Sequence, residues 1–383
     1  TLQLNLRVTP SPSACPMMVK VSSLVALTTI ESRLMPTSRH HEFRSPTYRL
    51  GVDIGGTFTD IVLVAEETGA LVVLKTPTTP DDPSRGFLTG VEEALQRFEI
   101  SPDQVSFTVH GTTIATNTII EGKAARAGLI TSKGFSDVLE IAYQTRPALY
   151  DINYEKPRPL VPRHRCIGVT ERLDAQGQTL APLDADETTQ AAKTLVAAGA
   201  EAIAIAFLHS YRNPEPERQA RELVRAAAPG IPVIISSDVC PQYGEYARTS
   251  TTVVNAVLQP KIGPYISRLE ARLTERGVRS PLHLMTSSGG TIAAAAAKEL
   301  PVHLVESGPA AGVIGAAFVA SELSVPGAAN KILALDIGGT TAKVALVDHA
   351  TPLLAEQFEV GASARPTTTA SRGQGYPVKT PVI

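Results

Sequence analysis

The stretch GVDIGGTFTDIVLV at residues 51–64 decides the fold, because it recurs near the other end of the chain as ALDIGGTTAKVALV at residues 334–347. In each copy an apolar run leads into Gly-Gly-Thr, and a second apolar run follows. Each copy therefore predicts a β-hairpin, with glycine supplying the positive φ that its turn requires. The predicted strands are Tyr48–Ile54 and Ile61–Val64 in the first copy, and Lys331–Ile337 and Val344–Val347 in the second.

The residue types of this hairpin suit a bound phosphate. Gly-Gly lets backbone N–H groups approach phosphate oxygens closely, and the threonine that follows adds a hydroxyl donor. The aspartate near the end of each first strand, Asp53 or Asp336, is placed to hold Mg²⁺ through water, because Mg²⁺ keeps much of its hydration shell and favours carboxylates. A tight turn alone also explains one copy, but two copies with matched flanks favour a pair of hairpins that clamp a nucleotide's phosphates. The sequence contains neither a Rossmann GxGxxG fingerprint nor a GxxxxGK[ST] loop.

The hairpin resembles the phosphate loops of the actin, sugar-kinase and heat-shock chaperone ATPase superfamily. That resemblance implies two α/β domains of ribonuclease-H type with MgATP in the cleft between them. Over residues 48–383 the chain resembles the hydantoinase A and 5-oxoprolinase family, which is implied to include ATP-dependent openers of hydantoins and lactams and ATP-using ketone carboxylase subunits. The motifs that carry this resemblance, in the family's order, are GVDIGGTFTD (51–60), HGTTIATNTIIEGK (110–123), GLITSKGFSDVLEIAYQTRP (128–147), EYARTSTTVVNA (245–256), SSGGTIA (287–293), ESGPAAGVIGA (306–316) and DIGGTTAKVAL (336–346).

The resemblance assigns phosphate or metal roles residue by residue. It implies that Asp53 and Asp336 hold the metal, and that Asp60 positions the nucleophile or a metal-bound water. Asp60 aligns with Lys343 in the second copy, where the lysine could pair with a β- or γ-phosphate or lie on the surface. The expected nucleotide contacts are Gly55, Gly56, Thr57 and Phe58 in the first copy, and Gly338, Gly339, Thr340, Thr341 and Lys343 in the second.

Further candidates lie between the two hairpins. Thr112 and Thr113 follow an apolar strand over Val105–Val109 and precede a predicted helix, so they could face phosphate at the helix N-terminus or simply cap it. His110 could act as a general acid or base, or be a hydrogen-bonded core histidine. Arg248 could bind an anionic substrate group, or stabilise a helix start by pairing with Glu245.

Composition excludes several classes of protein. Of the 383 residues 43% are hydrophobic and 19% are charged, and the net charge of −2 gives no basic field for nucleic acid or a membrane surface. Three widely spaced cysteines exclude a disulfide framework and fit a reducing compartment. No apolar run approaches the length of a membrane helix. We therefore expect a soluble, cytoplasmic, globular protein.

The chain is expected to divide into three parts. Residues 1–47 are basic, rich in Ser, Thr and Pro, and are interpreted as a gene-model artefact or a transit segment without folded elements. Residues 48–330 are expected to form the first ATPase half, with an inserted α/β subdomain over about 148–240. Residues 331–383 begin the second half, and too few residues follow Asp336 for a full domain, so we expect an incomplete one.

With the phosphate-binding hairpins, the family resemblance implies an ATP- and Mg²⁺-dependent hydrolase that opens a small cyclic amide by phosphorylating its carbonyl oxygen. The family implies a hydantoinase B-type partner subunit or fused domain, and we expect an oligomer. An ATP-dependent ketone carboxylase subunit, a nucleotide-gated module without catalysis and an inactive nucleotide-binding fragment stay open as alternatives.

Overall fold

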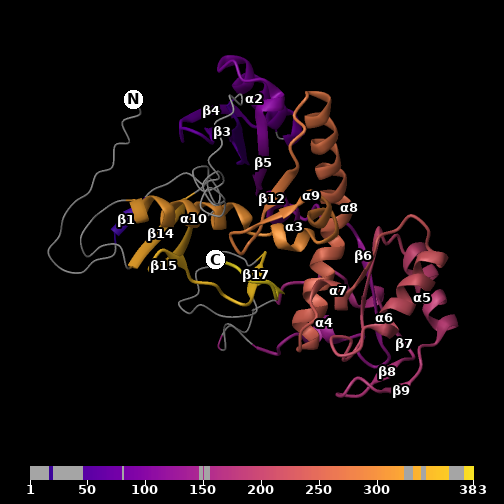
Figure 1. The fold of residues 1–383 in the computed structure, drawn as a ribbon. Coiled ribbons are helices and arrows are strands. Elements are labelled where there is room, and N and C mark those ends of the chain that lie inside the picture. The colour runs from indigo at the N-terminus through magenta and orange to yellow at the C-terminus, as the bar shows by residue number, and fades with distance from the viewer. Residues whose placement is uncertain are drawn as a thin grey trace.

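The computed structural model describes residues 17–19, 46–79, 82–145, 150, 156–322, 331–337, 342–361 and 375–383. These residues form a six-stranded sheet, two four-stranded sheets and two two-stranded sheets, with helices packed between and around them (Figure 1). The expected α/β class is confirmed.

The six-stranded sheet has the order β13-β12-β5-β2-β3-β4. Strands β2, β5 and β12 run parallel, whereas β3, β4 and β13 are antiparallel to their neighbours. Leu50, Val52 and Ile54 alternate with less apolar residues and are all buried, which fixes the inner face of the sheet. The strands span Tyr48–Ile54 (β2), Phe58–Ala65 (β3), Leu71–Pro77 (β4), Val105–Thr112 (β5), Leu282–Met285 (β12) and Thr291–Ala293 (β13).

Helices α2 (Pro83–Arg97) and α8 (Glu245–Glu275) pack on that inner face. Asp82 caps α2, since its side chain accepts a hydrogen bond from the backbone N–H of Ser84. Asp82 also pairs with Arg272 near the end of α8, with 3.3 Å between Nη1 and Oδ2. Helix α8 is 31 residues long and continues through two prolines, and it runs from the first sheet to the second (Figure 1).

A second sheet, of order β11-β10-β6-β7, is entirely parallel. Its helices α5 and α6 pack against one another on the outside, while α8 packs against β6, β10 and β11 (Figure 1). Helix and strand alternate over residues 185–235, whereas β6 lies upstream of the range of about 148–240 expected for the inserted subdomain, so the sheet extends beyond that range. The elements are β6 (Ala127–Ser132), β7 (Cys166–Val169), α5 (Ala185–Ala197), β10 (Ala202–Ala206), α6 (Glu215–Ala227) and β11 (Val233–Ile235).

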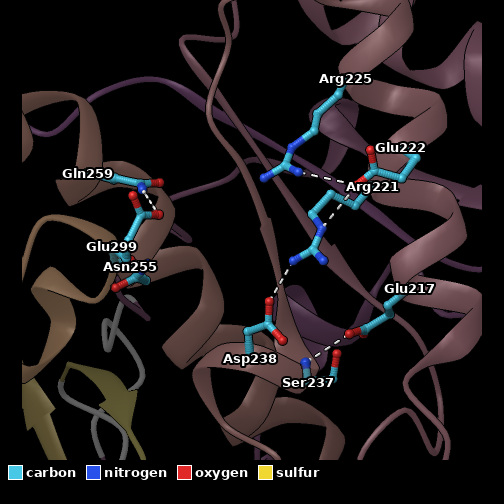
Figure 2. A network of polar contacts seen from close by, with 9 residues as sticks. All are labelled: Glu217, Arg221, Glu222, Arg225, Ser237, Asp238, Asn255, Gln259 and Glu299. Atoms are coloured by element: carbon cyan, nitrogen blue, oxygen red, sulfur yellow. Dashed lines mark hydrogen bonds and ion pairs between the residues drawn. The ribbon is translucent and has the colours of Figure 1, made fainter. Parts of the chain in front are cut away.

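Polar contacts attach α6 to the end of this sheet. The Glu217 carboxylate is fully buried and accepts hydrogen bonds from the backbone N–H of Ser237 at 2.8 Å, from Ser236 Oγ at 2.6 Å and from the N–H of Phe207 at 2.9 Å. Arg221 Nη1 lies 2.6 Å from Asp238 Oδ2 in α7 (Ser236–Val239) (Figure 2). A buried carboxylate with several donors keeps its charge satisfied, so this network holds α6 in register with β10 and β11.

The second hairpin lies in the third sheet, of order β1-β14-β15-β16. Helix α10 (Ser307–Glu322) packs against both hairpin sheets. Its Ala311 joins Val109 and Met285 of the first sheet in one apolar cluster. In a second cluster its Val313, Ala316 and Ala317 pack against the second hairpin at Ile332, Ala334 and Val347. Strands β14 and β15 span Lys331–Ile337 and Ala342–Asp348.

Part of the N-terminal stretch corrects the expectation that residues 1–47 hold no folded element. Met17–Val19 forms β1, which pairs in parallel with β14; residues 1–16 and 20–45 lie outside the described residues. No helix in the described ranges is long and apolar enough to span a membrane. The remaining elements are α3 (Ile114–Ile120), α4 (Val138–Ile141), β8 (Arg172–Leu173), β9 (Thr179–Ala181), α9 (Ala294–Glu299), β16 (Thr351–Pro352), β17 (Phe358–Val360), β18 (Tyr376–Val378) and three short 3₁₀ turns.

Candidate functional site

The turn between β2 and β3 is compact. The backbone N–H of Gly55 donates to the carbonyl of Phe58 at 3.0 Å. A Cβ atom on Gly55 would lie 3.1 Å from that same carbonyl oxygen, so a larger residue would require this carbonyl to move by a few tenths of an ångström. Neither Gly55 nor Gly56 has a positive φ, which corrects the expectation that the turn uses glycine for left-handed backbone.

Thr78, just after β4, holds this turn from outside the hairpin. Its hydroxyl donates to the Gly55 carbonyl at 2.9 Å, and its backbone N–H donates to the Thr57 carbonyl at 3.0 Å. Its hydroxyl also lies 3.1 Å from the hydroxyl of buried Thr59. Three contacts to one residue fix the path of the turn while Gly56 and Thr57 stay exposed.

Carboxylates and a lysine form a row across the sheet beside the turn. Asp53 on β2 lies directly opposite Asp60 on β3, and Asp60 lies opposite Lys75 on β4. Opposed residues share one face of a sheet, and like charges there repel one another. Lys75 offsets part of that repulsion, because its Nζ lies 2.8 Å from Asp60 Oδ1; it also lies 5.1 Å from the centre of the Phe58 ring.

The donors at this corner fit phosphate and Mg²⁺. Within the described part of the chain, no hydrogen bond uses the backbone N–H of Gly56 or Thr57, so both remain available to an anion. Asp53 and Asp60 offer carboxylate oxygens, and Mg²⁺ bound with phosphate is usually held by one or two carboxylates plus water. Among the described residues no cluster of three His, Cys, Asp or Glu side chains could enclose a metal without such help.

The second hairpin repeats the pairing of the first. Asp336 lies opposite Lys343, as Asp53 lies opposite Asp60, so the sequence alignment of Asp60 with Lys343 holds at the level of strand register. Asp336 is exposed. The turn residues Gly338, Gly339, Thr340 and Thr341 lie outside the described residues, and so does the side chain of Lys343.

The junction between β5 and α3 uses its threonines internally. Thr112 is buried, and its hydroxyl accepts a hydrogen bond from the N–H of Ile114 at 3.2 Å. Thr113 Oγ1 accepts from Asn117 Nδ2 at 3.3 Å. The Thr112 carbonyl accepts from Ser307 Oγ at 3.1 Å, which ties the start of α10 to the end of β5. These bonds favour a structural role for both threonines at the junction of β5, α3 and α10.

His110 lies inside the sheet, because β5 runs on to Thr112 where the sequence suggested an end at Val109. It is fully buried, with Nδ1 3.1 Å from the Val52 carbonyl and Nε2 2.8 Å from the Tyr265 hydroxyl. Burial lowers the pKa of His110 to about 4, so the ring is neutral at pH 7. Both ring nitrogens have protein partners and none reaches solvent, which argues for a structural histidine and against a general acid or base.

Arg248 is likewise internal. It is 2% exposed, and its Nη1 and Nη2 donate to Ser210 Oγ at 2.9 Å and to the Phe207 carbonyl at 2.7 Å. Both terminal nitrogens thus have partners inside the chain, and the Nε is buried without a partner among the described residues. This contact joins the first turn of α8 to the end of β10 and replaces both sequence interpretations, the anion site and the Glu245 pair.

Comparison with known proteins identifies the family. Residues 49–228 match the family model of the hydantoinase/oxoprolinase N-terminal region, and residues 248–383 match the hydantoinase/oxoprolinase model. The chain belongs to the hydantoinase/oxoprolinase family. The resemblance inferred from the motifs is thereby confirmed.

Relatives of this hydantoinase/oxoprolinase chain are named for different activities. It is 35% identical to the caprolactamase subunit alpha of Pseudomonas jessenii over 305 residues, which covers 78% of this chain and 43% of the relative. It is 36% identical to the acetone carboxylase beta subunit of Xanthobacter autotrophicus over 316 residues, which again covers 78% of this chain and 43% of the relative. The chain thus spans less than half the length of these relatives.

Solved structures confirm the fold class of this family member. Nucleotide-free acetone carboxylase superposes with a TM-score of 0.75 at 30% identity, covering 88% of this chain and 47% of that one. The ATP-dependent caprolactamase of Pseudomonas jessenii superposes with a TM-score of 0.73 at 33% identity and the same coverages. These neighbours have the actin-like ATPase fold, which is the expected architecture.

The sequence did not single out two residues that contact the first hairpin at its turn. Lys75 and Thr78 stand at and just after the end of an ordinary strand, with no motif around them. The sequence held one indirect signal for them. A third strand that pairs antiparallel with the second strand of the hairpin ends beside the turn, so its last residues lie next to the glycines of DIGGT.

Proposed function

We propose that this chain forms the ATP-binding part of an enzyme that opens a cyclic amide after phosphorylating its carbonyl oxygen. The observation that carries the proposal is the opposed pair Asp53 and Asp60 beside a turn whose Gly56 and Thr57 amides are available to phosphate. The repeated register at Asp336 and Lys343 supplies a second, related hairpin for the same nucleotide.

An amide carbonyl is a poor electrophile, so activation has to precede ring opening. The γ-phosphoryl group passes from ATP to the amide oxygen, which leaves ADP and an O-phosphorylated imidate. Water adds to the imidate carbon, the C–N bond breaks with proton transfer to the amine, and a second water releases phosphate from the resulting acyl phosphate. Mg²⁺ bound with ATP would offset the negative charge of the phosphates during transfer.

In this scheme the residues of the chain bind the phosphates and Mg²⁺ and orient a water. The turn amides of the first hairpin hold phosphate oxygens, and Asp53 and Asp336 are the residues that would hold Mg²⁺. Asp60 orients a water, with Lys75 limiting the charge that gathers there. A hydantoinase B-type subunit supplies the ring-opening step, a proposal supported by relatives that are named as subunits.

A ketone carboxylase subunit is the second candidate, and the acetone carboxylase relative favours it equally. There the γ-phosphoryl group would pass to the enol oxygen of a ketone, and bicarbonate would supply the carboxyl group. Both reactions would use the same phosphate-binding hairpins. They differ in the molecule that accepts the γ-phosphoryl group.

The test is ADP release by the chain co-expressed with a hydantoinase B-type subunit, measured with a lactam and with acetone plus bicarbonate. We expect lactam-stimulated release that Asp53→Asn lowers by about 100-fold or more, because the variant removes charge stabilisation at the transferred phosphoryl group. Asp348→Asn, at the far end of β15, is the matched control and should leave the rate unchanged. Release that requires ketone and bicarbonate would select the second candidate, and full activity of Asp53→Asn would refute the site.

A further inference from the structure

A row of charged residues lies along one edge of the parallel sheet, in a different sheet from either hairpin. Arg165, Arg126 and Glu201 directly precede β7, β6 and β10. These three strands are neighbours and run parallel, so the residues just before them lie close together at the amino-terminal edge of the sheet. The phosphate chemistry proposed above uses none of the three.

The one carboxylate of this row is shared by two cations. Glu201 Oε2 accepts a hydrogen bond from the backbone N–H of Arg126 at 2.8 Å, and the Arg126 Nε lies 3.9 Å from the same oxygen. Lys261 of α8 approaches the other oxygen, with 3.4 Å between its Nζ and Oε1. Three positive charges therefore stand at this edge against one negative charge.

Arg165 has no acceptor of its own in the described part of the chain. Its Nε and Nη1 are buried, and neither has a hydrogen-bond partner among the described residues. In the same ranges Arg165 forms no ion pair, whereas nearby Arg163 pairs with Asp137. A buried N–H without an acceptor is costly, and the cost is larger when the group carries a charge.

The neighbouring arginine adds to this cost. Burial and the charge of Arg126 both lower the pKa of the Arg165 guanidinium, although an arginine keeps its proton at neutral pH. The fold thus holds one positive charge partly out of water and beside a second one. Water could accept from the N–H groups of Arg165, but it would leave the repulsion between the two arginines. An anion would offset both.

The donors at this edge fit a compact oxyanion. A planar guanidinium presents pairs of N–H groups that match two oxygens of a phosphate or a carboxylate. The side chain of Arg126 is 68% exposed, so it can turn toward a ligand held by Arg165. Because positive charge is in excess here, two negative charges on the ligand are favoured over one.

We propose that Arg165 and Arg126 form a binding site for a dianionic phosphate group, separate from the nucleotide site. Arg165 supplies donors that are held in place by burial, and Arg126 supplies the second cation. Glu201 competes with the ligand for Arg126. Free phosphate and the phosphoryl group of a small phosphomonoester offer the same chemistry, and the experiment compares them.

The test is a titration of the full chain with inorganic phosphate, followed through the Nε–Hε cross-peak of Arg165 in nitrogen–proton correlation NMR. Arg165→Lys keeps the charge and assigns the cross-peak by its loss. We expect a shift that saturates with phosphate and is absent with chloride at the same ionic strength. Glycerol 3-phosphate is the second arm: tighter binding than phosphate would identify a phosphomonoester as the ligand, and weaker binding would identify free phosphate.

Three variants test the charges of the site. Arg126→Gln should weaken phosphate binding about tenfold or more, the effect of losing one charge-assisted hydrogen bond. Glu201→Gln removes the competing charge but keeps an acceptor for the Arg126 N–H, so it should strengthen binding several-fold. Arg218→Gln is the matched control and should leave the affinity unchanged. Arg218 is an exposed arginine of α6, a helix attached to the opposite, carboxyl-terminal edge of the sheet.

The proposal is overturned if the shift does not saturate, if chloride produces the same shift, or if Arg126→Gln and Glu201→Gln both bind phosphate like wild type. The cross-peak reports on Arg165 alone, so phosphate bound at the hairpins does not enter the measurement. The outcome is therefore independent of the proposed function.

Discussion

Asp53 and Asp60 have roles that depend on a cross-strand neighbour. Two carboxylates opposed across a strand pair repel one another, and a fold tolerates them where a cation is close. Lys75 supplies one positive charge, but it is more than half exposed and its pair with Asp60 is a surface ion pair of small stabilising energy. Two carboxylates on one face of the sheet beside the turn suit a divalent cation that arrives with phosphate.

His110 gives a prediction for the pH dependence of stability. Its pKa of about 4 in the folded chain lies below the value of about 6.5 in an unfolded one, so between these values the unfolded state binds more protons. Stability is therefore complete above about pH 6.5 and falls toward pH 4, by about 3 kcal/mol from this residue alone. Urea denaturation at a series of pH values measures it.

The matched variant is His110→Gln, which keeps a polar side chain without a titrating ring. We expect it to be about 1–3 kcal/mol less stable than wild type at pH 7, because at least one buried hydrogen bond is lost. The difference in free energy of unfolding between the two proteins should shrink as pH falls to 4, because only the wild type is destabilised by protonation of the unfolded-state histidine. A constant difference across the pH range would contradict the assigned pKa.

At the scale of elements, the loop after β4 supports the first hairpin through Thr78. Thr78→Val keeps the shape of the side chain but removes the hydrogen bonds of its hydroxyl to the Gly55 carbonyl and to Thr59. We expect a loss of about 1–2 kcal/mol in the free energy of unfolding and a several-fold weaker affinity for MgATP, because the turn loses its outer support. Calorimetric titration with ATP and urea unfolding measure the two effects.

Thr68→Val is the control for that variant. Thr68 lies in the turn between β3 and β4, at the opposite end of β4 from Thr78, where within the described part of the chain its hydroxyl accepts from the N–H of Ala70. It should leave MgATP affinity unchanged. Equal affinities for Thr78→Val and wild type would show that the turn needs no support from this loop.

Elements were predictable where their pattern is local. Apolar alternation around DIGGT placed β2 and β14 at their observed bounds. The end of β5 was misplaced because His110 and Gly111 read as polar junction residues, whereas a long-range contact with Tyr265 of α8 buries the histidine within the sheet. The anion role of Arg248 failed for the same reason, since its partners Phe207 and Ser210 are distant in sequence.

At the scale of the molecule, helix α10 couples the two hairpins. Its small residues let one face approach β5 and β12 and the other approach β14 and β15. The Gly and Ala residues of ESGPAAGVIGA (306–316) allow close approach of neighbouring elements, but the partners on each face follow only from the fold. The full extent of the second sheet was likewise not predictable from the sequence. Strand β6 pairs with β10, although β6 precedes the predicted insertion in the chain.

This coupling predicts an effect on ATP binding from a residue outside the phosphate turns. Ala316→Leu places three more carbon atoms between α10 and β14, where Ala316 is 2% exposed, and overpacking of this kind costs about 1–3 kcal/mol. Since Ser307 ties the start of α10 to Thr112, the helix cannot shift without moving one hairpin relative to the other. We expect MgATP affinity to fall about tenfold, measured by calorimetric titration on samples whose folding is verified by circular dichroism. Ala197→Leu, on the exposed side of α5, is the control: it adds the same three carbon atoms and should leave MgATP affinity unchanged. An unchanged MgATP affinity in Ala316→Leu would mean that the two hairpins bind nucleotide without a fixed spacing.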